Sequence, residues 1–176
     1  MIFRYNVNKI REDFPILKEN KGMIYFDSSC MSLKPKQVID KILEYYNKYS
    51  SCAGRSSHRL SKKTEEEVDI AREEVKKFIN AKSADEIIFT RNTTEGINLI
   101  ANSFGLVSGD EVILSDKEHN SNLIPWLKLK NDIGIIIKIC YSNPDGTFNL
   151  ESFKKCFNER TRIVSVVFTS NLDGVT

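Results

Sequence analysis

Short apolar runs alternate with longer amphipathic segments through the second half of the chain. The runs at 86–90 (EIIFT) and 163–169 (IVSVVFT) are typical of strands, and the segment at 93–104 repeats its apolar positions every three to four residues, as a helix does. The same pattern predicts further strands at 111–115 and 134–140 and further helices at 121–131 and 150–158.

These predicted strands are apolar on both faces, and a helical segment separates each from the next. Buried strands in this order form βαβ units, whose strands run parallel because each connection crosses over the sheet. We therefore predict an α/β fold with a parallel-rich sheet flanked by helices.

The first third of the chain is predicted to form a mostly helical arm. A short helical piece around Ile10 to Phe14 is expected to stop at Pro15, and a short strand is expected at Met23 to Phe26. Pro35 suits the first turn of a helix, and an apolar face recurs after it at helical spacing, at Val38, Ile42, Tyr45 or Tyr46, and Tyr49.

A loop and a long helix are predicted to follow this arm. Small polar residues fill 50–57, which is typical of a loop, and one apolar face runs along 61–79 opposite a heavily charged one. We expect a division at residue 60, with 1–60 forming the arm and first helix and 61–176 forming the first part of the α/β domain.

The last predicted strand has no helix after it. The run from Val164 to Phe168 is apolar enough for a strand buried on both faces, yet the sequence reaches Thr176 before a covering helix. We expect a longer protein, a split gene or an interrupted reading frame.

Composition and charge exclude several classes of protein. The 176 residues are 40% hydrophobic and 28% charged with few prolines and glycines, unlike disordered or collagen-like chains. A formal net charge of +2 is too small to attract nucleic acid.

No apolar run approaches the ~20 residues that cross a bilayer, and the N-terminus lacks an export signal. We therefore expect no membrane partner and a cytoplasmic location.

The four cysteines do not form a recognisable metal or disulfide framework. Cys30, Cys52, Cys140 and Cys156 never approach a CxxC spacing. Thiols inside cells are reduced by default. We expect neither a structural zinc site nor disulfides, and we assign no metal ligands.

Polar loops follow the predicted strands at the positions where α/β proteins bind ligands. Thr93 and Thr94 come at the start of a helix, where hydroxyls, free amides and the helix dipole favour a phosphate. Ordinary capping by Asn92 or Thr93 with Glu95 in the first turn is the alternative. The loop has neither a Walker motif nor the GxGxxG fingerprint.

Two other loops carry candidate residues with equally plain alternatives. His119, one of two histidines, precedes a predicted helix, where it is either a surface or capping residue or a ligand of the site. Asn120 and Ser121 are better capping residues, so we expect them to serve as the cap. The segment from Thr169 to Gly174 is either an ordinary turn without a function or part of a binding site. Three such loops at one edge of the predicted sheet favour a binding site.

An ordered set of motifs resembles one enzyme family. The set runs nearly end to end: Asp13 to Leu17, Tyr25 to Ser28 with Lys34 and Pro35, Arg55 and His58 before Leu60 and Ser61, Phe89 to Asn98, Gly109 to Glu111, Glu118 and His119 with Asn122, Pro125 and Trp126, Asp145 to Thr147, and Ser170 and Asn171 with Gly174. It resembles class V aminotransferase-like pyridoxal-phosphate enzymes of fold type I, in the branch of cysteine desulfurases and selenocysteine lyases.

The resemblance implies a role for each matching residue. Thr93 and Thr94 would hold the phosphate of pyridoxal 5'-phosphate, and His119 would stack on the pyridine ring as a catalytic residue. Asn171 would lie beside the phenolic oxygen of the cofactor or the substrate carboxylate. Arg55 and His58 would reach the active site of a partner subunit, although Arg55 is otherwise a plain solvated loop charge.

The same resemblance implies the activity and partners of a complete enzyme. It would remove sulfur from cysteine as a homodimer, pass the sulfur to an acceptor protein and take part in iron–sulfur cluster assembly. Ser29, Cys30, Met31 and Gly54 depart from the family pattern, so another class V aminotransferase or lyase remains an alternative. The Schiff-base lysine, the pyridine-pairing aspartate and the persulfide cysteine have no match here, so we expect this chain alone to be inactive, or a non-catalytic binding or assembly fragment.

Overall fold

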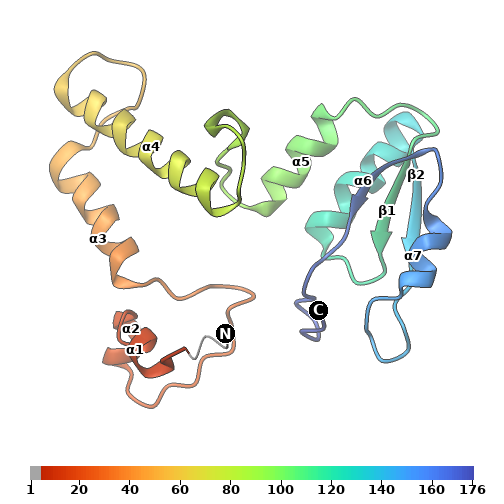
Figure 1. The fold of residues 1–176 in the computed structure, drawn as a ribbon, viewed down its shortest axis with the longest axis horizontal. Coiled ribbons are helices and arrows are strands. Elements are labelled where there is room, and N and C mark those ends of the chain that lie inside the picture. The colour runs from red at the N-terminus through yellow and green to blue at the C-terminus, as the bar shows by residue number, and fades with distance from the viewer. Residues whose placement is uncertain (1–4) are drawn as a thin grey trace. The chain divides into compact units, whose positions relative to one another are not determined.

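The computed structural model describes residues 5–176, which divide into two compact units. One unit ends at Ile88 and the other runs from Phe89 to Thr176. The division at residue 60 that we expected from the sequence stays a prediction. Helix α4 (Arg59–Phe78) groups with the N-terminal unit because it packs against η1 (Tyr45–Tyr49), a π-helical turn (Figure 1).

Helices and turns make up the described N-terminal unit. They are α1 (Val7–Arg11), α2 (Pro15–Glu19), α3 (Lys36–Glu44), η1, α4 and the 3-10 turn η2 (Ala84–Glu86). The helix expected to start near Pro35 is confirmed, with Pro35 as its N-cap residue. Helix α4 has 20 residues but is heavily charged, and no helix within residues 5–176 is both long and apolar enough to cross a membrane.

Two expectations for the arm are wrong. Pro15 begins α2 instead of only ending the preceding helix, because proline tolerates the first helical position, whose N–H has no partner in the helix. Residues 23–26 form no strand: Ile24 and Phe26 are exposed, and no strand among the described residues pairs with them.

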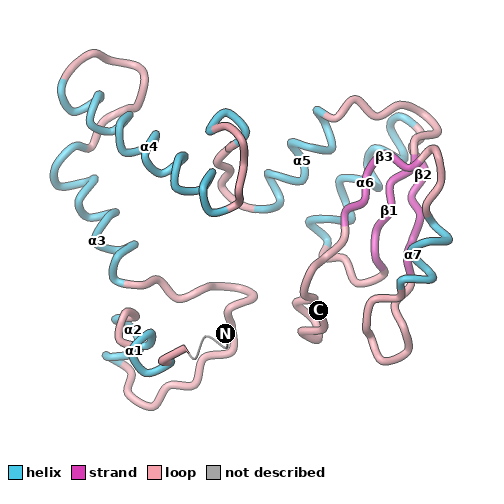
Figure 2. Tube along the Cα trace, viewed as in Figure 1, coloured by secondary structure: helices cyan, strands magenta, loops and turns pink. Residues whose placement is uncertain are grey.

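The C-terminal unit is a parallel sheet with helices on it. Its elements are α5 (Thr93–Ser103), β1 (Glu111–Ser115), α6 (Asn120–Ile133), β2 (Ile136–Cys140), α7 (Leu150–Cys156) and β3 (Thr161–Ser165). The strand order is β2-β1-β3 and both pairings are parallel (Figure 2). The predicted α/β class and parallel sheet are confirmed.

Helices α5 and α6 cover one face of this sheet. Val112 and Leu114 of β1 point to that face and pack with Trp126 of α6 and Ala101 of α5, all of them buried. Successive strand residues point to opposite faces. The other face therefore carries Cys140, whose thiol donates to a carbonyl at the start of α7.

Two predicted strand boundaries need correction. Residues 86–90 form η2 and an extended segment in which Ile88 and Phe89 are exposed, because no strand in the described residues pairs with them. Strand β3 runs from Thr161 to Ser165 instead of 163–169. It leaves the sheet where the N–H of Val167 donates to the carboxylate of Glu118 at 2.8 Å, rather than to a neighbouring strand.

Candidate functional site

The carboxyl ends of the three strands form one rim of the sheet. Because β1, β2 and β3 are parallel, the loops at 116–119, 141–149 and 166–176 all leave the same edge (Figure 1). Ligands of open parallel sheets bind at this edge. We therefore place the candidate site at this edge.

Thr93 and Thr94 occupy the first turn of α5. Asn92 is the N-cap residue, and its side-chain oxygen accepts the N–H of Glu95 at 2.9 Å. Both threonines are exposed, and their backbone N–H groups have no acceptor within the part of the chain that the structure describes. Asn92 thus accounts for the capping, and it leaves two hydroxyls and two amides free to bind an anion.

Glu95 fastens the loop that leads into α5. Its carboxylate accepts the backbone N–H of Arg91 at 2.6 Å and contacts the Arg91 guanidinium at 3.3 Å. The backbone hydrogen bond, and then the guanidinium, lower the pKa of Glu95 below its ordinary value. This carboxylate is therefore engaged by Arg91 and holds the loop in place.

His119 is the N-cap residue of α6, and our assignment of that cap to Asn120 or Ser121 is wrong. Its Nδ1 accepts the backbone N–H of Ser121 at 3.1 Å. A neutral imidazole that accepts at Nδ1 carries its proton at Nε2. The His119 side chain is exposed on the rim, so the cap fixes the ring's position while Nε2 stays available.

Asn171 lies in a tight turn after β3. The N–H of Gly174 donates to the carbonyl of Ser170 at 2.9 Å, and the N–H of Ser170 donates to the carbonyl of Val175 at 3.0 Å. Asn171 is exposed within this turn. Its side-chain amide therefore remains available to a ligand.

Arg55 and His58 belong to the N-terminal unit. His58 is the N-cap residue of α4: its Nδ1 accepts the N–H of Ser61 at 3.3 Å, and its Nε2 lies 3.4 Å from Ser51 Oγ. Arg55 is exposed and makes no hydrogen bond or ion pair within residues 5–176. The structure thus gives His58 a capping role and leaves the Arg55 guanidinium free.

A polar network beneath the rim was assigned no role from the sequence. Asn122 of α6 is buried; its amide donates to Glu118 at 2.7 Å and to the carbonyl of Ser165 at 3.1 Å, and its oxygen accepts the indole N–H of Trp126 at 3.2 Å. Glu118 also accepts from Ser115 and Val167. Helix α6 is thereby tied to the ends of β1 and β3. Glutamate and asparagine four residues apart across a helix start could have indicated such a link.

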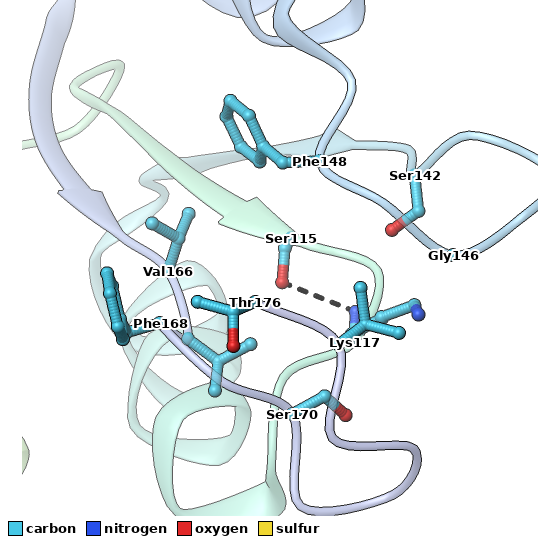
Figure 3. A pocket seen from close by; sticks show the side chains of 11 residues that line it. Ser115, Lys117, Ser142, Gly146, Phe148, Val166, Phe168, Ser170 and Thr176 are labelled. Atoms are coloured by element: carbon cyan, nitrogen blue, oxygen red, sulfur yellow. Dashed lines mark hydrogen bonds between the residues drawn. The ribbon is translucent and has the colours of Figure 1, made fainter. Parts of the chain in front are cut away.

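A cavity of about 310 Å³ opens on the same rim (Figure 3). Its lining is largely apolar and includes Phe148, Val166 and Phe168, with Lys117 and Ser115 as polar members. None of Thr93, Thr94, His119 or Asn171 lines it. His119 and Asn171 therefore lie in loops of the rim, Thr93 and Thr94 lie in the same unit at the start of α5, and the cavity is a separate feature of the rim.

The free groups of this unit suit the pyridoxal phosphate that the sequence resemblance implies. Thr93 and Thr94 offer the hydroxyl and amide donors that a phosphate needs at a helix start. His119 offers an exposed, oriented ring and Asn171 an exposed amide. These residues fit the phosphate and ring of the cofactor.

Comparisons with known proteins identify the family of this chain. A cysteine desulfurase of Escherichia coli O7:K1 is 41% identical over 97% of this chain, which spans 43% of that relative's length. The solved apo cysteine desulfurase of Thermococcus onnurineus NA1 has a TM-score of 0.85 at 33% identity, over 97% of this chain and 42% of its own. The cysteine desulfurase CsdA of Escherichia coli has a TM-score of 0.80 at 29% identity, over 97% of this chain and 43% of its own. The aminotransferase class V family matches residues 24–176, and the chain belongs to that family.

Proposed function

We propose that this chain is the N-terminal portion of a pyridoxal-phosphate-dependent cysteine desulfurase, which takes sulfur from cysteine and leaves alanine and an enzyme persulfide. The observation that carries the proposal is one family-matched unit that has free donors at Thr93 and Thr94, at the start of α5, and has His119 and Asn171 in loops of the rim. The curated relatives that cover 97% of this chain are named cysteine desulfurases. The chain spans 43% of their length, so the activity belongs to the complete enzyme.

Thr93 and Thr94 bind the cofactor phosphate in this proposal. Their hydroxyls and free amides would donate to its oxygens, and the positive end of the α5 dipole would add to the attraction. When bound, the cofactor supplies an electron sink for bond breaking at the amino acid, and the protein supplies orientation and electrostatics.

His119 and Asn171 orient the reacting groups. The His119 ring, held by the hydrogen bond from Ser121 to Nδ1, would stack on the pyridine ring, and its exposed Nε2–H would donate a hydrogen bond near the substrate. The Asn171 amide would donate to the phenolic oxygen of the cofactor or to the substrate carboxylate. His119 and Asn171 lie in loops that follow the carboxyl ends of the neighbouring strands β1 and β3, which supports a shared role.

The complete enzyme is proposed to act as a cytoplasmic homodimer that passes sulfur to an acceptor protein for iron–sulfur cluster assembly. Arg55, which is exposed and unpaired within residues 5–176, and His58 serve the active site of the partner subunit in this proposal.

Mixed dimers test the assignment of Arg55 to the active site of the partner subunit. An Arg55→Ala subunit paired with a subunit lacking the cofactor-linking lysine should regain a working site, and confirmed mixed dimers without activity would contradict the assignment.

Replacing His119 by asparagine separates stacking from capping. Asparagine is a strong N-cap residue, so His119→Asn keeps the start of α6 and removes only the ring. In the complete enzyme we expect a changed cofactor absorbance and a turnover lower by roughly 10²- to 10⁴-fold. Asn149→Ala, which removes the cap of α7, is the matched control and should leave the spectrum unchanged. A normal spectrum and turnover in His119→Asn would leave His119 with a capping role alone.

Product analysis tests the reaction itself. Cysteine should yield alanine and sulfide in the presence of a reductant. Transfer of the amino group to a keto acid without sulfide would instead identify another class V aminotransferase.

A further inference from the structure

Three successive residues after β1 connect its loop to the segments after both neighbouring strands. Asp116 accepts the N–H of Ser142 at 3.2 Å and its hydroxyl at 2.7 Å, in the loop after β2. Glu118 accepts the N–H of Val167 after β3. Lys117 donates to Asp173, in the turn that holds Asn171. The stretch immediately before His119 therefore ties the rim together.

The contact between Lys117 and Asp173 is the least local of these links. The two residues are 56 positions apart, and the Lys117 side chain is only 20% exposed. Lys117 Nζ rests against Gly146, where a Cβ atom would lie 2.6 Å from it and where φ is +85° (Figure 3). A side chain at position 146 would thus displace the ammonium group, and glycine leaves room for it.

Asp173 links Lys117 to the turn in which Asp173 lies. One oxygen of Asp173 pairs with Lys117 and the other accepts the N–H of Val175 at 3.1 Å. Ser170 closes the same turn by accepting the N–H groups of Gly174 at its carbonyl and of Leu172 at its hydroxyl, the latter at 3.2 Å. Asn171 lies inside this closed turn, so its position depends on where Asp173 is held.

We propose that Lys117 is a positioning residue of the candidate site, whose ion pair with Asp173 sets the place of the Asn171 amide relative to the loop that carries His119. Lys117 itself contacts neither cofactor nor substrate in this account. The structural part of the inference stands on the contacts alone, whereas its consequence for turnover rests on the proposed function.

Amide hydrogen exchange on the chain tests the structural part. Lys117→Met keeps the length of the side chain and removes its charge, and Asp173→Asn removes the partner's charge. In each variant we expect the amides of Ser170, Gly174 and Val175 to exchange roughly three- to tenfold faster, while the buried amides of β1 are unchanged. The double variant should be no faster than either single one.

A lysine in an exposed helical pair provides the matched control. Lys128→Met breaks its pair with Asp132 on α6 and should leave exchange at 170–175 unaltered. Exchange there within twofold of the unmodified chain, in both Lys117→Met and Asp173→Asn, would overturn the proposal. Faster exchange that extends to β1 in both variants would also overturn it, because the contact would then serve overall stability.

The complete, cofactor-loaded enzyme tests the consequence. If Lys117 acts through Asn171, adding Lys117→Met to Asn171→Ala should cause no further loss of turnover, whereas Lys117→Met alone should reduce it. Fully multiplicative losses would overturn the positioning role and leave the proposed function intact. If Asn171→Ala changes neither turnover nor the cofactor spectrum, the assignment of Asn171 in the proposed function fails instead, whatever the exchange data show.

Discussion

The C-terminal sheet unit and the N-terminal helical unit differ in the kind of residue that each buries. In the C-terminal unit, Trp126, Val112 and Leu114 lie in a continuous apolar core between the sheet and helices α5 and α6. In the described N-terminal unit the buried apolar residues are Tyr49 and Ile87, and the buried polar residues are Ser61 and Thr64. Burial of apolar surface is worth far more than exposed polar contacts, so the two units should respond differently to the same kind of substitution.

The polar contacts of the N-terminal unit nevertheless define its geometry. Thr64 Oγ1 donates to the carbonyl of Tyr49 at 2.9 Å, and Ser61 Oγ donates to the carbonyl of Cys52 at 2.6 Å. Both hydroxyls lie on the face of α4 that meets the preceding segment. They fix how α4 meets η1 without supplying much apolar burial. Local order in this unit therefore depends on a few hydroxyl hydrogen bonds, whereas order in the sheet unit depends on the packing of its apolar core.

Removing the largest buried side chain should produce the largest effect. Trp126→Ala takes away a side chain that is 1% exposed and leaves a cavity, so we expect a loss of about 3–5 kcal/mol in unfolding free energy, measured by urea denaturation. Phe78→Ala in α4, where the ring is 90% exposed, should change stability by no more than about 0.5 kcal/mol. Equal losses from both variants would contradict the contrast between the units.

Breaking the polar network under the rim should cost less than removing the tryptophan. Asn122→Ala leaves the Trp126 N–H and a Glu118 oxygen without their partner inside the protein, which costs about 2 kcal/mol. Urea denaturation measures this loss, and Asn149→Ala at the half-buried start of α7 provides a comparison expected near 1 kcal/mol. A loss in Asn122→Ala below that of Asn149→Ala would show that the network contributes nothing beyond a cap.

How well the sequence predicts an element depends on whether its partners are local. Strand β1 occupies the predicted 111–115 because it is apolar on both faces and is flanked by β2 and β3, both within the chain. The segment 86–90 has an equally apolar pattern, yet no strand pairs with it in the described residues. A strand is a property of a pair of segments, so hydrophobicity alone overpredicted it.

The candidate site shows the same limit at single residues. Thr93 and Thr94 could be proposed because a capped helix start is a local pattern; the structure leaves their donors free, and their binding role stays a prediction. The His119 cap was missed because propensity favours asparagine and serine, whereas the chain places the imidazole nearest the Ser121 N–H. The pairing of Lys117 with Asp173 spans 56 residues, and no local pattern predicts it.

One hydroxyl in the helical unit should contribute as much as an average hydrogen bond. Thr64→Val keeps the shape of the side chain and removes the donor to the Tyr49 carbonyl. We therefore expect the free energy of opening of α4, measured by hydrogen exchange of its amides, to fall by about 1 kcal/mol. Thr64→Ser keeps the hydroxyl and should lose less. Exchange in β1 should not change in either variant. If Thr64→Val weakened β1 and α4 equally, the two units would not be separate in stability.

The smallest effect is expected at a carboxylate between two lysines, and it should depend on pH. Glu67 accepts from Lys41 and Lys63, each at 2.7 Å, and these hydrogen bonds, Lys41 first, lower its pKa from 4.5 to about 2. A carboxyl with a depressed folded-state pKa stabilises the fold above its unfolded value and loses that contribution as pH falls through the folded value. The difference in α4 stability between the unmodified chain and Glu67→Gln should therefore be constant from neutral pH to about 5, narrow below 4.5 and close near pH 2, as measured by hydrogen exchange. Glu66→Gln is the matched control, since Glu66 lies 3.9 Å from Lys63 and is more exposed, and it should show almost no difference at any pH. A difference for Glu67→Gln that persists at pH 2, or one that Glu66→Gln reproduces, would mean that packing of the side chain, and not its charge, accounts for its contribution to α4.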